Sequence, residues 1–463
     1  MKILQPLLYL SVLLIADSAQ AQQKLTLKDA IQQAVDNYGI VKAKANYAKA
    51  SKASVTQAKR DYLPNLNIGA QQVYGTINGQ NGPLYAFGGA VASSGLALSN
   101  QNWNAAFGSL YLTNVNWDFF AFGRAKEKVK TAQAAATRDS SDWQQEIFQQ
   151  KVRVSAAYLN LLASQRLTAS YRKNLSRADT FRQVVISRAK GGLIPGVDSS
   201  QANAEISSAK IMLTQALDAE QQQAKDLAVL IGTDNYNFIL DSLFIARVPA
   251  DINATQSPDV INNHPILNYY QSRIDVSNRQ TAYYKTFNYP VFSLVGVFQT
   301  RGSGFNSTYG ADQTAYSSNY ADGITPTRSN YLIGIGVSWN LTQPLRISQQ
   351  VKSQRYISQG LQDEYNQTKL ELNAQLNLSD TRIKNALSNY REVPMQIKAA
   401  SDAWIQKSVM YKTGLSNLVD VTQARYALIR AETDRDIAYN NVWQALLLKA
   451  AAAGNFNLFI NEL

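Results

Sequence analysis

Residues 331–341 read YLIGIGVSWNL, and in this stretch the apolar residues alternate with small or polar ones. A period of two is typical of a β-strand that has one apolar face and one small or polar face. Residues 111–119 (YLTNVNWDF) show the same alternation, and residues 65–70 (NLNIGA) show a shorter version of it. At about ten residues, the longer segments have the length of a transmembrane β-strand.

The end of this strand recurs in the first half of the chain. Trp117-Asp118-Phe119 has its counterpart in Trp339-Asn340-Leu341, and Gly192-Leu193 has its counterpart in Gly414-Leu415. The difference in residue number is the same for both pairs of segments. Chance matches would not keep one interval over so long a span, so the sequence predicts an internal duplication.

A second constant interval lies upstream of the strands. Residues 37–40 (NYGI) correspond to residues 263–266 (NHPI), and Pro64 corresponds to Pro290 at the same spacing. This interval is slightly longer than the first one. The interval therefore changes between Pro64 and Trp117, where a loop would tolerate a difference in length between the two copies. We predict two copies of one unit, over residues 22–245 and 246–463.

Each copy is predicted to begin with a helix that ends at the proline before the first strand. In the first copy, residues 26–29 (TLKD) resemble a capping box, and the helix runs to about Tyr62. In the second copy, Ser257-Pro258-Asp259 supplies an N-cap followed by proline. Two Gly-, Ser-, Asn- and Tyr-rich stretches, about 75–104 and 301–328, are expected to be the loops between paired strands.

A helix of unusual length is expected after each strand pair. Residues 124–190 contain no Pro and no Gly, and one continuous helix of this length measures on the order of 100 Å. Residues 346–412 are the counterpart, with a kink expected near Pro394. Turns at 191–195 and 413–417 lead into return helices of roughly half that length. Helices this long must pack side by side as a coiled-coil array.

These lengths constrain the assembly. The first helix and the return helix of one copy, laid end to end, match the long helix, so each copy forms a column with strands at one end and a turn at the other. Two strand pairs give four strands, and a lipid-facing sheet of four strands has unpaired edges. If the strands face lipid, the chain must therefore oligomerise to close a barrel.

The N-terminus and the composition narrow the class of protein. Lys2, the largely apolar residues 3–15 and Ala19-Gln20-Ala21 predict a signal peptide over residues 1–21. The chain has no Cys and one His, His264, which excludes thiol nucleophiles, disulfides and the usual zinc sites. The net charge of +12 comes from Lys and Arg scattered among Gln, Ser and Ala, which is typical of solvated helix faces and not of a nucleic-acid surface. We expect no enzymatic activity, cofactor or metal.

Together these features resemble the TolC-type outer-membrane efflux proteins. The signal peptide, the tandem units, the Pro before the first strand and Gly-Leu-x-x-x-Val-Asp at each turn carry the resemblance, which covers about residues 25–459. It implies a mainly α fold with a membrane β-barrel. Four strands from each of three protomers would complete a 12-strand β-barrel, and the long coiled-coil helices would form an α-barrel across the periplasm. Residues of about 232–255 and those after about Gly454 would form an equatorial belt.

The resemblance also implies a gate at the periplasmic end of the helices. By alignment, Tyr411 falls on the gate Tyr, Asp420 on the first Asp of a luminal ring, and Asp198 on the partner Asp of the other turn. Ser416 stands where an Arg is typical of the family, and Gln423 stands where a second ring Asp is typical.

The latch between Arg and Asp is therefore missing in its familiar form, and the basic residues Arg188, Lys190 and Lys412 are candidates to replace it. A simpler interpretation of Asp198 and Asp420 stays open: each starts a return helix, where a carboxylate favours the helix dipole.

The resemblance gives roles to three further sets of residues. The turn residues Gly192, Leu193, Gly414 and Leu415 would contact a periplasmic adaptor, although glycines here are also expected as helix C-terminal residues. Pro64 and Pro290 would mark the junctions of barrel and helices. Trp103, Tyr111, Trp117 and Trp339 would anchor the barrel at the lipid interface, although aromatic packing between strands also explains the last three.

Our main hypothesis is a homotrimeric passive duct in the outer membrane of a Gram-negative bacterium. It would contact outer-membrane lipid and export small molecules or proteins in a tripartite efflux pump or type I secretion system. Its partners would be a periplasmic adaptor (membrane fusion protein) and an inner-membrane pump of the RND or ABC type. The rival hypothesis is a periplasmic coiled-coil scaffold or adaptor without a barrel, and the duplicated strands argue against it.

Overall fold

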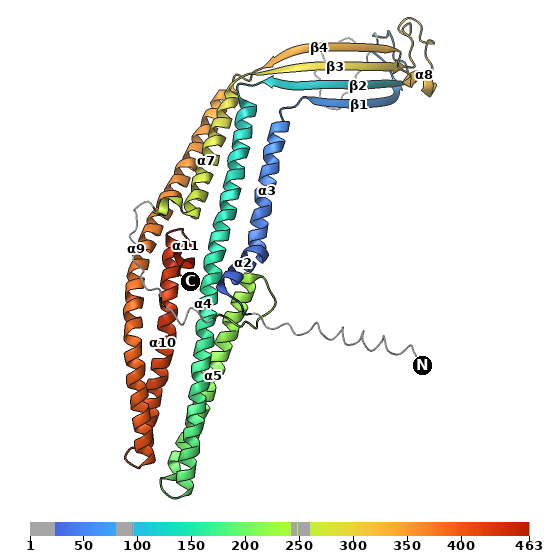
Figure 1. Cartoon of the computed structure of the whole chain (residues 1–463). Coiled ribbons are helices and arrows are strands. Elements are labelled where there is room, and N and C mark those ends of the chain that lie inside the picture. Colours follow the sequence, from blue (N-terminus) through green and yellow to red (C-terminus); the bar gives the residue numbers. More distant parts are fainter. Residues whose placement is uncertain (1–23, 80–94, 96, 242–247, 249–259, 463) are drawn as a thin grey trace, which may run out of the picture. The chain divides into compact units, whose positions relative to one another are not determined.

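The computed structural model describes residues 24–79, 95, 97–241, 248 and 260–462 (Figure 1). The chain forms two compact units, one from Met1–Ala50, Ala136–Ile274 and Gln359–Leu463, the other from Ser51–Ala135 and Asp275–Ser358. Both predicted copies contribute to each unit. The predicted signal peptide, the predicted helix start at Ser257 and most of the first belt segment lie outside the described residues.

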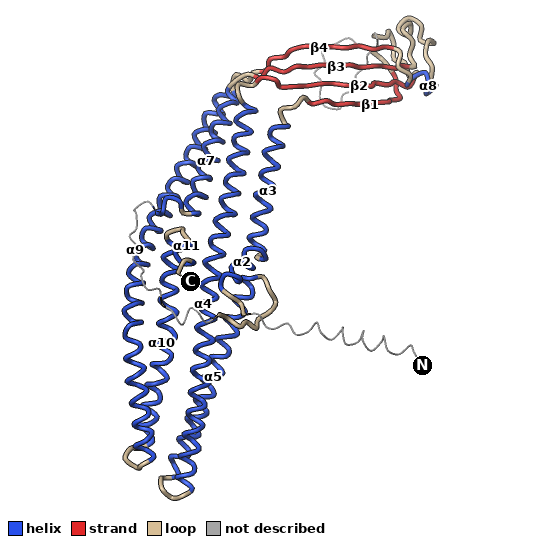
Figure 2. Tube along the Cα trace, viewed as in Figure 1, coloured by secondary structure: helices blue, strands red, loops and turns tan. Residues whose placement is uncertain are grey.

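The second unit contains a four-stranded antiparallel sheet in the order β1-β2-β3-β4 (Figure 2). The strands are β1 (Asn65–Thr76), β2 (Ala105–Phe120), β3 (Val291–Ser303) and β4 (Arg328–Ser338). Each copy supplies one hairpin, and β2 pairs with β3 to join the two copies. The prediction of two strands per copy is confirmed, but β4 ends at Ser338, before the predicted end at Leu341.

The register of the sheet separates its two faces. Leu66 lies opposite Val115, and Phe298 lies opposite Tyr331. Following these pairs across the strands places most aromatic and large aliphatic side chains on one face, which we call the apolar face. Its members are Leu66, Ile68, Tyr74, Phe107, Tyr111, Val115, Trp117, Phe292, Leu294, Phe298, Tyr331, Ile333, Ile335 and Val337. We call the opposite face the polar face. It carries Asn, Gln, Ser and Arg side chains and several glycines, interspersed with Val and Leu residues.

A short helix, α8 (Tyr320–Ile324), lies in the loop between β3 and β4, and no pattern in the sequence predicts it. The helix packs against β2 and β3 on the apolar face near Phe107. A Cβ on Gly323 would lie 2.4 Å from the Cβ of Phe107, so only glycine allows this approach. The Ser109 hydroxyl donates to the carbonyl of Ile324 at 3.0 Å and fixes the helix to the strand.

The long helices follow the predicted pattern. α4 spans Arg124–Lys190 and α9 spans Gln343–Lys412, and α9 continues through Pro394 as one helix. The return helices are α5 (Gly196–Ile231) and α10 (Leu418–Ala452), and a short helix α11 (Asn457–Ile460) follows. Within the described part of the chain, no helix combines the length and the apolar character that crossing a membrane requires.

The first helix of the chain is interrupted, which corrects the prediction of one continuous helix. α2 (Leu27–Asn37) begins at Thr26, whose hydroxyl accepts a hydrogen bond from the Asp29 amide at 3.1 Å as the capping-box pattern predicts. Tyr38 then adopts an extended backbone (φ −63°, ψ 121°), and α3 (Gly39–Arg60) follows. Glycine at the start of α3 costs helix stability, so this position favours a break.

The second copy has its interruption at the equivalent residue. A 3-10 turn, η1 (Val260–Asn263), precedes α7 (Pro265–Lys285), and His264 lies between them. His264 corresponds to Tyr38 at the same interval that relates Pro290 to Pro64. A further 3-10 turn, η2 (Thr286–Asn288), then leads to β3. The interval that identified the duplication therefore also relates the two breaks.

Each break lies against the glycine that ends a return helix. Gly232 ends α5 with φ 77°, and a Cβ there would lie 3.1 Å from the Cβ of Asn37. Gly454 follows α10 with φ 67°, and a Cβ there would lie 2.7 Å from the imidazole ring of His264. The end of α5 therefore lies against the break between α2 and α3, and the end of α10 lies against the break between η1 and α7. This agrees with the prediction that the return helix and the first helix of each copy lie end to end.

The largest apolar core of the first unit forms around this level. It joins α2 to α4, α5, α10 and α11 through Leu27, Ile31, Tyr158, Leu161, Leu227, Trp443 and Phe459. The buried Tyr158 hydroxyl donates to the carbonyl of Leu25 at 2.8 Å and accepts from the Asp241 amide at 2.9 Å. Burial, more than any neighbouring charge, raises the pKa of Tyr158, so the phenol stays protonated and can make both bonds.

Candidate functional site: the ends of the two helical hairpins

Both long helices end in the same hydrogen-bonded motif. Gly192 (φ 73°) and Gly414 (φ 81°) adopt left-handed backbones that other residues rarely take. The amide of Leu193 donates to the carbonyl of Arg188 at 3.0 Å, and the amide of Leu415 donates to that of Met410 at 2.8 Å. Bonds of this span define a Schellman motif. The prediction that these two glycines end the long helices is confirmed.

The first turns of the two return helices differ in their caps. The side chain of Asn417 accepts a hydrogen bond from the Asp420 amide at 2.8 Å, so Asn417 is the N-cap of α10. Pro195 precedes α5 and offers no side-chain cap. Asp198 and Asp420 lie in the first turns, where their charge favours the helix dipole, but neither carboxylate is the cap.

The carboxylate of Asp420 is paired within its own hairpin. It accepts hydrogen bonds from Lys407 Nζ at 2.9 Å and from Ser416 Oγ at 3.1 Å. These two bonds, that of Lys407 first, hold the pKa of Asp420 below its usual range. Gln423 lies one turn further along α10 and is exposed. Ser416 therefore contacts Asp420 directly, whereas Gln423 contributes no charge to this group.

Sequence reasoning missed Lys407. Positions 407 and 420 lie equally far from the turn at 413–414, so the antiparallel packing of α9 and α10 brings them together. This equal spacing from the turn is the feature of the sequence from which the contact could have been predicted. In the first hairpin the repeat places Val185 at the position equivalent to Lys407, just as it places Asp198 at that of Asp420. Val185 is buried and apolar, so the first hairpin offers Asp198 no matching lysine.

Tyr411 lies in the apolar cluster that joins the two hairpins. Its ring centre is 5.2 Å from that of Phe181, and the cluster also includes Val185, Leu418 and Val421. Burial is the main cause that raises the pKa of Tyr411. The negative charge of Asp198 raises this pKa further, and the positive charge of Arg188 lowers it. Among the described residues the Tyr411 hydroxyl finds no hydrogen-bond partner.

Arg188 joins the end of α4 to the end of α9. One guanidinium nitrogen donates to the carbonyl of Tyr411 at 2.6 Å and to that of Lys412 at 2.7 Å. The guanidinium carbon also lies 5.4 Å from the centre of the Tyr411 ring. Carbonyls at a helix C-terminus carry partial negative charge, so a cation is favoured there.

Two further arginines join the hairpins at other levels. Arg177 of α4 makes a two-pronged ion pair with Glu432 of α10, at 3.0 and 2.5 Å. The buried Arg425 of α10 pairs with Glu205 of α5, which also accepts a hydrogen bond from Tyr426. The bidentate pair of Arg177 fixes orientation as well as distance, and together the two pairs hold the hairpins in one register.

The turns themselves present apolar side chains to solvent. Leu193 and Leu415 are 70% and 74% exposed, and Val197 and Val419 are each 69% exposed. The four side chains occupy equivalent positions in the two copies. Aliphatic side chains gathered at a helix-hairpin tip are typical of a surface that another protein covers.

The residues predicted at the junction of strands and helices lie where the strands begin. Pro64 and Pro290 directly precede β1 and β3. The indole nitrogen of Trp117 donates to the carbonyl of Tyr62 at 2.8 Å, and that of Trp339 donates to the carbonyl of Asn288 at 3.1 Å. Tyr62 and Asn288 each lie two positions before the proline of their copy, so the two tryptophans make equivalent bonds.

The remaining predicted aromatic residues differ in their surroundings. Trp103 is 80% exposed, next to the start of β2. The Tyr111 hydroxyl accepts a hydrogen bond from Gln72 at 3.0 Å and lies 3.4 Å from the carbonyl of Ile324. Bonds between described elements therefore engage Tyr111, Trp117 and Trp339, whereas the side chain of Trp103 is largely exposed.

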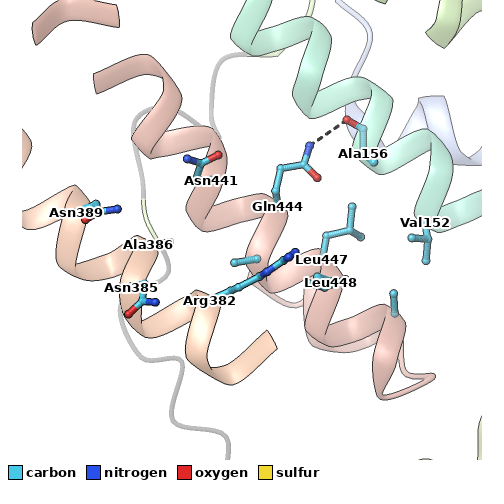
Figure 3. Close-up of a pocket in the computed structure, with 12 residues that line it drawn as sticks. Val152, Ala156, Arg382, Asn385, Ala386, Asn389, Asn441, Gln444, Leu447 and Leu448 are labelled. Carbon is cyan, nitrogen blue, oxygen red and sulfur yellow. Dashed lines mark hydrogen bonds between the residues drawn. The ribbon is translucent and has the colours of Figure 1, made fainter. Parts of the chain in front are cut away.

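The first unit also contains an open groove of about 470 Å³ between α4, α9 and α10 (Figure 3). Val152 and Ala156 line one side, and Arg382 of α9 extends into it. Gln444 donates to the carbonyl of Ala156 at 3.2 Å across one wall. None of the predicted gate residues lines this groove. In the described ranges no group of three or more His, Asp or Glu side chains could hold a metal ion.

The amino-acid sequence matches one family model. Residues 30–233 match the model described as outer membrane efflux protein. No curated protein matches the sequence.

Solved structures of outer-membrane channels share the fold over more than nine tenths of the chain. The CusC structure, described as a transmembrane channel, aligns with a TM-score of 0.75 at 12% identity, over 93% of this chain and 92% of that one. The CmeC outer membrane channel of Campylobacter jejuni aligns at 0.74 and 14% identity, over 92% and 85%. The outer membrane protein VceC of Vibrio cholerae aligns at 0.71 and 16% identity, over 93% and 96%.

Proposed function

We propose that this chain is an outer-membrane efflux channel of the TolC family, and that it works as a homotrimer that forms the exit duct of an export assembly. The observation that carries the proposal is the sheet with two different faces. Its apolar face exposes Ile68, Tyr331 and Ile333 by 82%, 81% and 77%, which is costly in water and favourable against lipid.

The edges of the sheet support an assembly of several copies. Within the described part of the chain, β1 and β4 each pair on one side only, so each leaves a row of main-chain donors and acceptors open. In lipid these groups need partners, and β4 of one protomer against β1 of the next supplies them. Three protomers with four strands each then close a 12-strand β-barrel, with the polar face toward the lumen.

At the far end of the duct, the hairpin ends form the gate. Tyr411, Asp198, Asp420, Ser416 and Gln423 line or support the constriction. Around a three-fold axis the carboxylates concentrate negative charge and favour cations. Arg188 takes the place of the familiar latch by holding the end of α9 through two main-chain carbonyls.

The exposed turns form the docking surface for a periplasmic adaptor. Gly192 and Gly414 shape the turns, and Leu193 and Leu415 are the side chains that the adaptor covers. The adaptor connects the duct to an inner-membrane pump of the RND or ABC type, which selects the cargo of small molecules or proteins.

At the other end, Pro64 and Pro290 mark the change from helix to membrane strand. Trp103 anchors the barrel at the lipid interface, because its side chain is exposed. Tyr111, Trp117 and Trp339 reach the interface too, but they also tie the strands to neighbouring elements.

Purified protein reconstituted in a planar bilayer tests the proposal. A trimer that migrates differently on gels before and after heating, and that inserts as a pore of low conductance, is expected. A Tyr331→Asp/Ile333→Asp variant is the matched control, since charge on the apolar face should prevent insertion. A wild-type protein that stays soluble and monomeric, and never inserts into lipid, would support the coiled-coil scaffold instead.

A further inference from the structure

Charged residues are nearly absent from the two β-hairpins. Residues 62–117 contain none, and residues 290–341 contain four: Arg301, Asp312, Asp322 and Arg328. The two arginines lie in the strands, whereas the two aspartates lie in the loop between β3 and β4. The only other charged residue within the four strands is Asp118, near the end of β2 that is away from the loops, so the charge at the loop end of the strands is entirely positive.

The two arginines lie directly opposite each other. Arg301 near the end of β3 pairs in register with Arg328, the first residue of β4. Both side chains are exposed. Like charges directly opposite in neighbouring strands destabilise a sheet, so this pair lowers the stability of the fold in the absence of a counter-ion.

The arginine pair lies on the polar face, away from α8. Arg301 is opposite Leu110, whereas the next residue, Gly302, is opposite Ser109 and faces α8. A Cβ on Gly302 would lie 2.7 Å from the carbonyl oxygen of Gly323 in that helix. Because neighbouring residues in a strand point to opposite faces, Arg301 and Arg328 lie on the face that α8 leaves open.

The acids of the hairpins have other partners, and Asp118 of β2 accepts a hydrogen bond from the hydroxyl of Ser293. Asp312 accepts hydrogen bonds from the amide and hydroxyl of Thr314, and Asp322 accepts one from the hydroxyl of Ser317. In the described ranges neither guanidinium of the pair takes part in an ion pair, and residues 80–94 and 96 include no acid in their sequence.

We propose that Arg301 and Arg328 form an anion-binding site at the loop end of the duct. The inference rests on the proposed function, because the trimer turns the polar face inward and gathers six guanidinium groups around one opening. Planar guanidinium groups bind carboxylate and phosphate oxygens in pairs, so the ligands are small anions with several carboxylates or phosphates. The site gives the outer opening a preference for anionic cargo.

Reconstituted channels test the site with citrate as the probe. Citrate added on the loop side of wild-type channels should reduce the potassium chloride current, and the effect should weaken as salt rises because added ions screen the arginines. Arg301→Gln/Arg328→Gln should weaken this block by roughly tenfold or more. Arg301→Lys/Arg328→Lys keeps the charge and should retain most of the block, as the matched control.

The outcomes separate this inference from the proposed function. Channels that insert and conduct but show the same citrate block in the wild-type and double-Gln proteins overturn the anion site and leave the duct intact. Block that occurs only from the helical side also overturns it. Failure of the wild-type protein to form channels at all overturns both. Each variant is first shown to form the heat-dissociable trimer, so that a folding defect is recognised before currents are compared.

Discussion

Arg188 of α4 donates to the last carbonyls of α9, those of Tyr411 and Lys412, at 2.6 and 2.7 Å. A single side chain thus connects the ends of two long helices that come from different copies of the repeat. The bond is made to main-chain atoms, so it does not depend on which residues the second copy carries at these positions. A latch of this kind therefore does not need an arginine at position 416, where this chain has Ser.

Replacing Arg188 should loosen the hairpin ends. Arg188→Ala removes two charge-assisted hydrogen bonds, worth about 1.5–3 kcal/mol each, and should raise the single-channel conductance of the resting channel. Lys190→Ala, at an exposed position in the same helix end, is the control and should leave conductance unchanged. Equal conductance in the Arg188→Ala and wild-type channels would rule out a latch at this residue.

The two aspartates of the proposed gate should contribute unequally to cation preference. Lys407 neutralises Asp420, whereas no ion pair within the described residues involves Asp198. Asp420→Ala should weaken cation preference slightly, and Asp198→Ala should weaken it more. Reversal potentials under a salt gradient measure both, and a larger effect of Asp420→Ala would contradict this order.

The pairing of Asp420 also predicts a pH dependence. Because Lys407 and Ser416 lower the pKa of this carboxyl in the folded protein, its stabilising effect is present above the unfolded pKa of about 3.9 and is lost as the pH falls through the lower folded pKa. Lys407→Met should move the NMR titration of the Asp420 carboxyl to higher pH. A titration that does not move would show that the contact is absent in solution.

His264 should make the junction of α10 and α7 sensitive to acid. Nε2 lies 2.9 Å from the carbonyl of Ala451, and Nδ1 accepts a hydrogen bond from the Ile266 amide at 3.1 Å, which only the neutral imidazole can do. Burial lowers the pKa of His264, and the stabilisation is therefore present above the unfolded pKa of about 6.5 and lost as the pH falls through the folded value.

Thermal unfolding followed by circular dichroism at pH 8 and pH 5 measures this effect. The wild-type melting temperature should fall at pH 5, and His264→Gln, which does not titrate, should remove that part of the fall. An unchanged pH dependence in the variant would assign the acid sensitivity to other groups.

The junction glycines offer a graded test of packing. Gly454 and Gly414 both have positive φ, but a Cβ meets the His264 ring at Gly454 and open space at Gly414. Gly414→Ala should cost about 1 kcal/mol of unfolding free energy from backbone strain alone. Gly454→Ala should cost more, because the ring must also move, and equal losses would contradict the close contact.

The paired tryptophans should act as structural ties. Trp117→Phe and Trp339→Phe keep an aromatic ring but remove the indole donor, and each should cost about 1 kcal/mol. Trp103→Phe changes a side chain that is largely exposed and makes no hydrogen bond to the described elements, so it should cost less. If all three variants lower the stability of the trimer equally in lipid, interface anchoring explains these residues better than the bonds to Tyr62 and Asn288.

Much of the architecture could be predicted because its signals are local or periodic. Alternation marks the strands, the absence of Pro and Gly marks α4, and constant intervals mark the duplication. The break at Tyr38 was missed because one glycine is a weak local signal, and the packing of Asn37 against Gly232 depends on the tertiary fold. The contacts of Arg188 and Lys407 depend on how two helices lie side by side, and the opposition of Arg301 and Arg328 depends on strand register.

The central strand pair has a consequence for the order in which the chain folds. β2 ends at Phe120 and β3 begins at Val291, so all of α4, α5 and α7 separate two neighbours in one sheet. Pairing of distant segments is slow because closing a long loop costs entropy before any contact repays it. Helices α4 and α5 are complete in the chain before β3 has emerged, so the helical hairpin is expected to form first and to shorten the distance that the two halves of the sheet must close.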